Sequence, residues 1–207
     1  RAPLQRALQT GTRDVYQFAN RIYQAKEETM SVIESWSIKL AQEVAPDEVD
    51  LAPLMAEAFR TGGKAREELF QSSGGTVGAF APGDVISVMP PLYQSMFAVA
   101  PIFIAVLSSD AVKGCLDAVK NALTVIELRM KAEKLAPGPA ETTVKPAVPP
   151  GDAYAPLRRV IDTMRGELQS SGLSAEKADV ITLRALKALL EEPQGATQFV
   201  QQLSESR

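Results

Sequence analysis

The sequence predicts an all-α fold, a helical bundle of long amphipathic helices followed by a small C-terminal three-helix unit. Apolar residues recur at three- and four-residue steps over most of the chain, and glycine and proline fall between these periodic segments. Too few strand-like segments are present to build a sheet. Of the 207 residues, 45% are hydrophobic and 23% charged, close to the average of globular proteins, so the chain can bury a core.

Composition divides the chain into three expected parts. Residues 1–135 form a helical bundle domain that contains a charge-free apolar segment at 85–109. Residues 136–156 hold six prolines and hardly any large apolar side chain, which is typical of a linker. Residues 157–207 form a three-helix unit that is marginal by size, so we expect it to dock on the larger domain or on a partner.

The first domain begins with a long amphipathic pattern. Its apolar positions keep returning to one face and Pro46 supplies a stop, so we expect a helix over 13–44. Two shorter helices are expected over 50–60 and 64–73, each ended by a pair of glycines. A glycine-rich connector at 76–83 follows them.

The apolar segment 85–109 has 25 uncharged residues, long enough for a helix that crosses a bilayer core. Three prolines interrupt it, and neither of its long proline-free pieces spans a bilayer. We therefore expect a buried helix over 91–107 at the centre of the larger domain. A buried strand at 102–107 is the alternative secondary structure.

Insertion into a membrane is the alternative role for this segment. Aspartates border it on both sides and no tryptophan belt flanks it, which favours the buried interpretation. If the segment left the core as a hairpin, its large apolar side chains would enter the bilayer. The residues expected to insert are Leu92, Phe97, Ile102, Phe103 and Leu107.

The clearest helical pattern lies at 110–135. Six apolar residues are spaced 4, 3, 4, 3 and 4 positions apart, a heptad seam of nearly three heptads. The seam either packs inside its own domain or pairs with a partner as a coiled coil. Its residues, candidates for partner contact, are Val112, Leu116, Val119, Leu123, Ile126 and Met130.

Three helices are expected in the C-terminal unit. The first ends at Gly172, and Ser174 caps the second, over 175–192, which is apolar on most sides. Pro193 and Gly195 are expected to break this helix before the last one begins. The narrow face of the last helix supplies two further candidates for partner contact, Phe199 and Leu203.

The residue types exclude several kinds of chemistry. Histidine is absent, which removes the commonest acid–base catalyst and metal ligand near neutral pH. Cys115 is the only cysteine and is expected to be a small buried residue. Residues 60–65 place two glycines before a lysine but lack the spacing of a P-loop, so they predict a turn between helices. We expect no catalytic residue, no metal site and no cofactor.

The leading hypothesis is a non-enzymatic helical protein–protein interaction or scaffold subunit of a larger assembly, with a protein partner or a second copy of the chain. A net charge of −3 without a basic region argues against nucleic acid. The alternative is a membrane-active protein, a translocator, pore-former or membrane-anchored subunit that inserts 85–109. Enzyme is a third class. The chain starts at Arg1, so any targeting peptide would already have been removed, and the compartment stays open.

Overall fold

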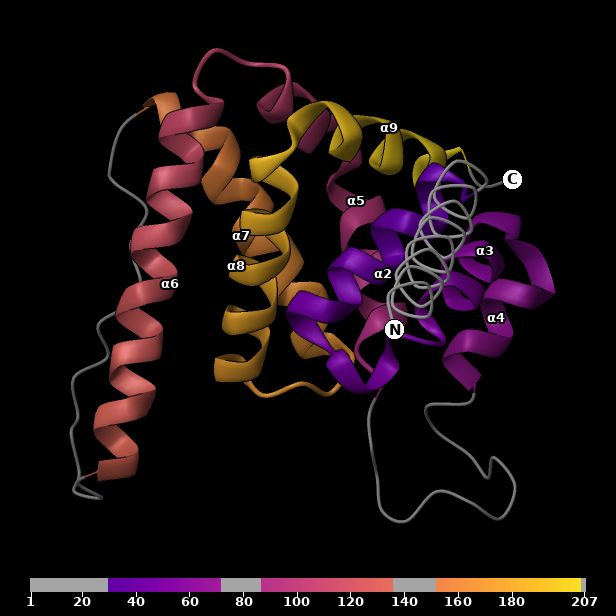
Figure 1. Ribbon diagram of the computed structural model, residues 1–207, viewed down its shortest axis with the longest axis horizontal. Coiled ribbons are helices and arrows are strands. Elements are labelled where there is room, and N and C mark those ends of the chain that lie inside the picture. The colour runs from indigo at the N-terminus through magenta and orange to yellow at the C-terminus, as the bar shows by residue number, and fades with distance from the viewer. Residues whose placement is uncertain (1–29, 72–86, 136–151, 206–207) are drawn as a thin grey trace, which may run out of the picture. The chain divides into compact units, whose positions relative to one another are not determined.

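The computed structural model describes residues 30–71, 87–135 and 152–205, and most of these residues are helical, with no strand among them (Figure 1). The predicted all-α fold is confirmed. The α-helices are α2 (Val32–Val44), α3 (Ala52–Thr61), α4 (Gly63–Gln71), α5 (Met89–Leu107), α6 (Val112–Leu135), α7 (Ala155–Ser170), α8 (Ala175–Glu191) and α9 (Pro193–Ser204). Two short 3-10 turns are η1 (Pro46–Glu48) and η2 (Asp152–Tyr154).

Contacts divide the chain into the units Arg1–Ser31 and Val32–Arg207, and all the helices above belong to the second. The helix expected over 13–44 is therefore seen only as α2, and its positions 13–29 lie outside the described residues. Met30 and Ser31 are not helical, which corrects the prediction there. Ser31 and Glu34 have the Ser-x-x-Glu spacing of a capping box, which marks the start of a helix. The prediction missed this signal because the apolar repeat continues on both sides of it.

α5 lies at the centre of the hydrophobic core. It contacts α3, α7 and α9, and most of its side chains are buried. This confirms the expected buried helix and shows that a strand at 102–107 was the wrong alternative. Pro90 and Pro91 lie in the first turn of α5. Proline is tolerated there because the N–H groups of a first turn have no hydrogen-bond acceptor within the helix. Pro101 lies inside the helix on its exposed side.

The C-terminal helices pack on the earlier ones in a shared core. α7 lies against α5, α8 contacts α6 and α2, and α9 contacts α5, α2 and α3 (Figure 1). The expected division at 136–156 stays a prediction. Residues 136–151 of that linker lie outside the described residues, while η2 and α7 begin before residue 157.

The helix ends follow local sequence signals. Gly62 and Gly63 both have positive φ, of 73° and 52°, and form the turn that joins α3 to α4. This confirms a turn at 60–65. α4 is the helix expected over 64–73, and its expected glycine stop and the connector at 76–83 lie outside the described residues.

Gly172 ends α7 with a φ of 94°. Its N–H donates to Gln169 and that of Leu173 to Leu168, the hydrogen-bond pattern of a Schellman motif. The hydroxyl of Ser174 accepts from the N–H of Lys177, which confirms the predicted cap of α8.

One predicted break was misplaced. The helical path is interrupted at Glu192, and α9 begins at Pro193 as its first residue. Gly195 does not break the helix; it lies within α9, against the side chain of Trp36. A Cβ atom at position 195 would lie 3.0 Å from Nε1 of Trp36, so glycine is needed there for close packing rather than for a turn.

Candidate functional site

The heptad seam of α6 faces the interior of its own chain. Its side chains belong to, or pack against, the hydrophobic core, and α6 lies along α8. Contact of the seam with another protein stays a prediction. Three seam residues are buried: Val119, Leu123 and Ile126. Three are half-buried: Val112, Leu116 and Met130.

The other candidates from the sequence also lie in or against the core. Phe199 and Leu203 of α9 are fully buried. Of the residues considered for membrane insertion, Phe97 and Ile102 are half-buried and the remaining three are buried, namely Leu92, Phe103 and Leu107. Among the α6 residues whose burial is described, the exposed large apolar side chains lie outside the seam, namely Val125 and Leu128.

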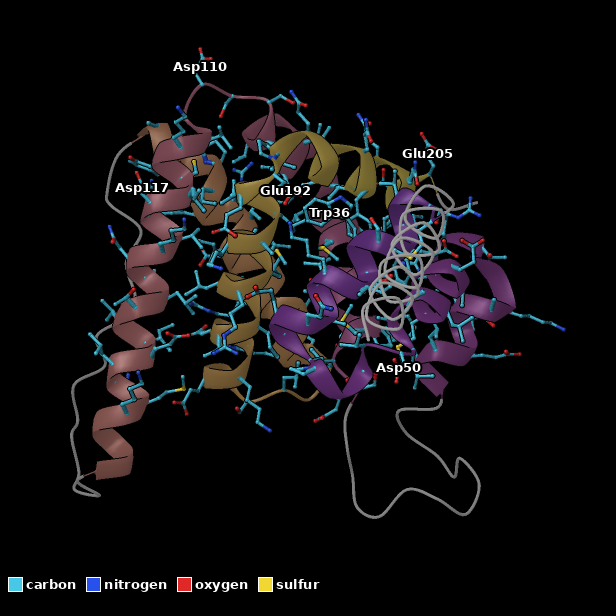
Figure 2. All side chains as sticks on the ribbon, in the orientation of Figure 1. Trp36, Asp50, Asp110, Asp117, Glu192 and Glu205 are labelled. Atoms are coloured by element: carbon cyan, nitrogen blue, oxygen red, sulfur yellow. The ribbon has the colours of Figure 1, made fainter. Side chains whose placement is uncertain are left out.

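α5 is long and apolar enough to cross a membrane, with a mean hydropathy of 1.5. No other helix of the described part of the chain meets that standard, and 61% of the apolar stretch of α5 is buried. Asp110, which follows α5, points away from the helices (Figure 2). These properties are shared by the core helix of a soluble protein and by a span.

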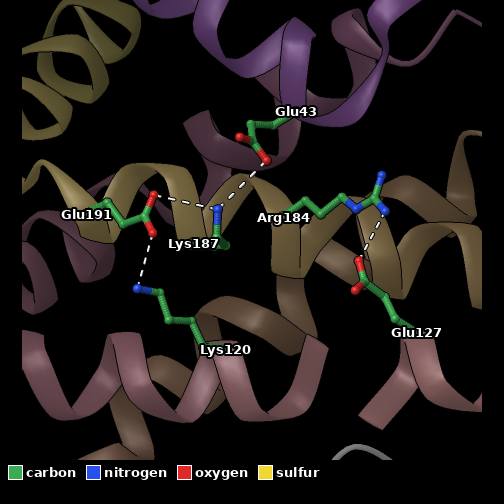
Figure 3. A network of polar contacts seen from close by, with 6 residues as sticks. All are labelled: Glu43, Lys120, Glu127, Arg184, Lys187 and Glu191. Atoms are coloured by element: carbon green, nitrogen blue, oxygen red, sulfur yellow. Dashed lines mark hydrogen bonds and ion pairs between the residues drawn. The ribbon is translucent and has the colours of Figure 1, made fainter. Parts of the chain in front are cut away.

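Ion pairs border the contact between α6 and α8 (Figure 3). Lys120 of α6 lies 3.2 Å from Glu191, and Arg184 of α8 lies 3.1 Å from Glu127. Lys187 joins the same network through Glu191. The side chains are between a quarter and a half exposed, so each pair contributes at most about 1 kcal/mol. Two of the pairs join α6 to α8, and the pair of Lys187 with Glu191 lies within α8.

Arg66 stands apart from these paired charges. Its guanidinium carbon lies 4.0 Å from the ring centre of Phe59 and 4.7 Å from that of Phe97. One of its N–H groups donates to Oε1 of Gln94 on α5. Burial lowers the pKa of Arg66, although a guanidinium stays protonated at neutral pH. Among the described residues, no carboxylate forms an ion pair with it.

Arg66 lines an open cleft of about 470 Å³ between α4, α5 and the C-terminal end of α7. Four lining residues come from one face of α4, where they are spaced three and four positions apart. The six lining residues are Gly63, Arg66, Glu67, Phe70, Gln94 and Ser171. We call this site the Arg66 cleft.

Sequence reasoning missed the Arg66 cleft. Gln94 lies 28 positions from Arg66, and Phe97 lies on the same distant helix. The helical spacing of Gly63, Arg66, Glu67 and Phe70 was the available signal, but it could not reveal which side chains would meet Arg66.

Other features of the described residues bear on chemistry. Cys115 is buried, as predicted, and burial raises the pKa of its thiol. Within the described ranges, no group of three or more Cys, Asp and Glu side chains is placed to hold a metal ion. Comparison with protein-family models, curated proteins and solved structures finds no match to this chain.

Proposed function

We propose that this chain is a non-enzymatic helical protein–protein interaction or scaffold subunit that contacts its partner through the Arg66 cleft. The observation that carries the proposal is a cation that packs against two phenylalanine rings at an open cleft, with no ion-pair partner among the described residues. An interaction site of this kind needs no catalytic group.

The arrangement of Arg66 supports binding by lowering its entropic cost. An arginine side chain loses up to about 2 kcal/mol of rotamer entropy when it is immobilised. Here Phe59, Phe97 and Gln94 already restrict it in the free protein. Arginine and aromatic residues also dominate the energy of protein interfaces, and Phe70 in the same lining is 36% exposed.

Photo-crosslinking tests this proposal. Benzoylphenylalanine would replace Phe70 in the full chain, expressed in the cells from which the sequence comes. Leu128, which is 61% exposed on α6, is the matched control position outside the cleft. We expect a discrete crosslinked adduct from position 70, its loss when Arg66→Ala is added, and no such adduct from position 128. If position 70 gave the same adducts with and without Arg66→Ala, and both variants unfolded at the same urea concentration, the proposal would be rejected.

The second candidate function is membrane activity, favoured by α5. This helix has 19 residues and no charged side chain, and its exposed positions include Ala98, Pro101 and Ala105. A membrane could therefore receive its outer face without burying a charge.

Liposome flotation tests the membrane alternative. If α5 enters the bilayer, the full chain floats with vesicles and Ala105→Lys abolishes flotation, because a buried lysine is costly in hydrocarbon. Asn121→Lys, at an exposed position of α6, is the matched control and should not change flotation. Absence of flotation with neutral and anionic vesicles, together with protection of α5 from hydrogen exchange, would reject membrane activity.

A further inference from the structure

We infer that the Arg66 cleft binds a carboxylate carried by an acidic and apolar peptide segment of the partner, in preference to a phosphorylated segment. This inference rests on the proposed function, since it names the chemistry of the partner at the same site. Donor groups, charge balance and an apolar neighbour in the lining support it.

The guanidinium of Arg66 has unused donors. A guanidinium carries five N–H groups in a fixed plane. Among the described residues, its one hydrogen bond goes from Nη2 to Oε1 of Gln94. The rings of Phe59 and Phe97 lie against the group and limit its movement. A carboxylate can accept two parallel hydrogen bonds from such a group, which a single lysine ammonium does not offer.

Gln94 supplies a second kind of donor to the same cleft. Its amide oxygen accepts from Arg66, which determines the orientation of the amide. The NH2 group of Gln94 therefore lies on the other side of the amide, and no hydrogen bond from it to the described residues is found. A carboxylate bound to Arg66 has oxygen lone pairs left for this NH2 group.

Glu67 determines which anion fits. The lining contains one cation, Arg66, and one anion, Glu67, and its other four residues are uncharged. A carboxylate brings a single negative charge, so the lining and its ligand together carry an excess of one negative charge. A phosphomonoester brings about −1.5 to −2 charges near neutral pH, so it would be repelled more strongly by Glu67.

Phe70 indicates that the carboxylate is part of a larger, partly apolar ligand. Its side chain belongs to the same lining and remains 36% exposed. The cleft, at about 470 Å³, is much larger than a carboxylate group alone. An apolar side chain next to the acidic residue of a peptide would cover Phe70 and remove its ring from water.

Binding of matched peptides to the full chain tests this inference. The probes are blocked pentapeptides that differ only at the centre, where glutamate, glutamine or phosphoserine lies between phenylalanine and leucine. Propionate is the probe for a free small carboxylate. Isothermal titration calorimetry measures the affinity of each peptide for the wild type and for every variant. The NMR resonance of the Arg66 Nε–H group, assigned by its loss in Arg66→Lys, reports contact at the cleft in the wild type.

We expect the glutamate peptide to bind at least about tenfold more tightly than the glutamine and phosphoserine peptides, and more tightly than propionate. Arg66→Lys should weaken its binding about tenfold, because the bidentate pair is lost. Arg60→Lys, at an exposed position paired with Glu57 outside the cleft, is the matched control and should not change binding. Glu67→Gln should selectively improve binding of the phosphoserine peptide.

Three results would overturn the inference: equal binding of the glutamate and glutamine peptides, tighter binding of the phosphoserine peptide, or propionate binding as tightly as the glutamate peptide. Each is distinguishable from failure of the proposed function. A crosslinked partner at position 70 with no carboxylate preference leaves the proposed function in place and rejects only this inference. No partner adduct at position 70 rejects the proposed function itself.

Discussion

Glu48 caps the N-terminus of α5 from a distant part of the chain, and removing it should destabilise the protein. Its Oε1 accepts from the N–H of Val88 at 2.6 Å, and its Oε2 accepts from the N–H of Met89 at 3.1 Å and from the hydroxyl of Ser87 at 2.7 Å. Val88, the N-cap residue, receives no side-chain cap from its own segment. Glu48 therefore satisfies donors that the helix itself cannot pair.

The expected loss for Glu48→Ala can be worked out from these contacts. Removing an N-cap costs about 0.5–2 kcal/mol, and an acidic group at a helix N-terminus contributes about 0.3–1 kcal/mol. Glu48 is half-buried, so water replaces part of what is lost. We expect the free energy of unfolding to fall by about 2 kcal/mol. Glu48→Gln keeps an acceptor oxygen but no charge, so it should cost about half as much.

Urea unfolding followed by circular dichroism measures the effect. Asp50→Ala is the matched control, because Asp50 is an exposed carboxylate close to Glu48 in the sequence, and it should change the free energy by less than about 0.5 kcal/mol. Hydrogen exchange adds a local readout, since the amides of Val88 and Met89 should exchange faster in Glu48→Ala. A free energy of unfolding that matches the Asp50→Ala value, with unchanged exchange, would refute the capping role.

Three further predictions follow from the packing and charges. Gly166→Ala should raise the free energy of unfolding by about 0.5–1 kcal/mol, because no described atom lies within 4 Å of a Cβ at that position. Gly195→Ala should lower the free energy of unfolding by about 1–3 kcal/mol, because its Cβ would crowd the ring of Trp36. Urea unfolding that gave changes of the same sign for both variants would contradict this prediction. Thr182→Val should raise the melting temperature by about a few degrees, because the buried hydroxyl of Thr182 has no hydrogen-bond partner among the described residues. A lower melting temperature in calorimetry would mean that this hydroxyl is paired. Burial acts to raise the pKa of Glu191, but hydrogen bonds and charge from two lysines outweigh it and lower the pKa below its ordinary 4.5. The stabilisation is therefore present above that value and is lost as pH falls through the folded pKa, so urea midpoints of wild type and Glu191→Gln should differ at pH 7 and converge near pH 3.

Signals close together in the sequence predicted the helices well. The 3.6-residue pattern of α8, the cap at Ser174 and the stop at Gly172 each act within one or two turns, and the structure has all three. The capping-box spacing at Ser31 was equally local but was masked by a longer apolar pattern. Gly195 was misjudged because a glycine that opens a turn and one that admits Trp36 look the same in sequence.

The arrangement of charges was beyond prediction. Arg66 meets Gln94 across 28 positions, and Glu48 meets Val88 across 40. The first contact joins side chains of α4 and α5, and the second joins a side chain of η1 to the backbone N–H that precedes α5. Both depend on the packing of α3, α4 and α5. The sequence shows that Arg66 is a cation on an amphipathic helix; only the structure shows that it packs against two aromatic rings beside an open cleft.

The sequence by itself determined the all-helical fold class and favoured a buried helix at 91–107 over a strand or a membrane-inserting segment, because backbone hydrogen bonds, glycine and proline breaks and apolar spacing act over a few residues. Tertiary structure decided which groups meet. The seam of α6 packs against α8, Glu48 caps the N-terminus of α5, and Arg66 lines a cleft. These outcomes depend on how all the apolar faces fit into one core, and that fit is a property of the whole chain rather than of any segment.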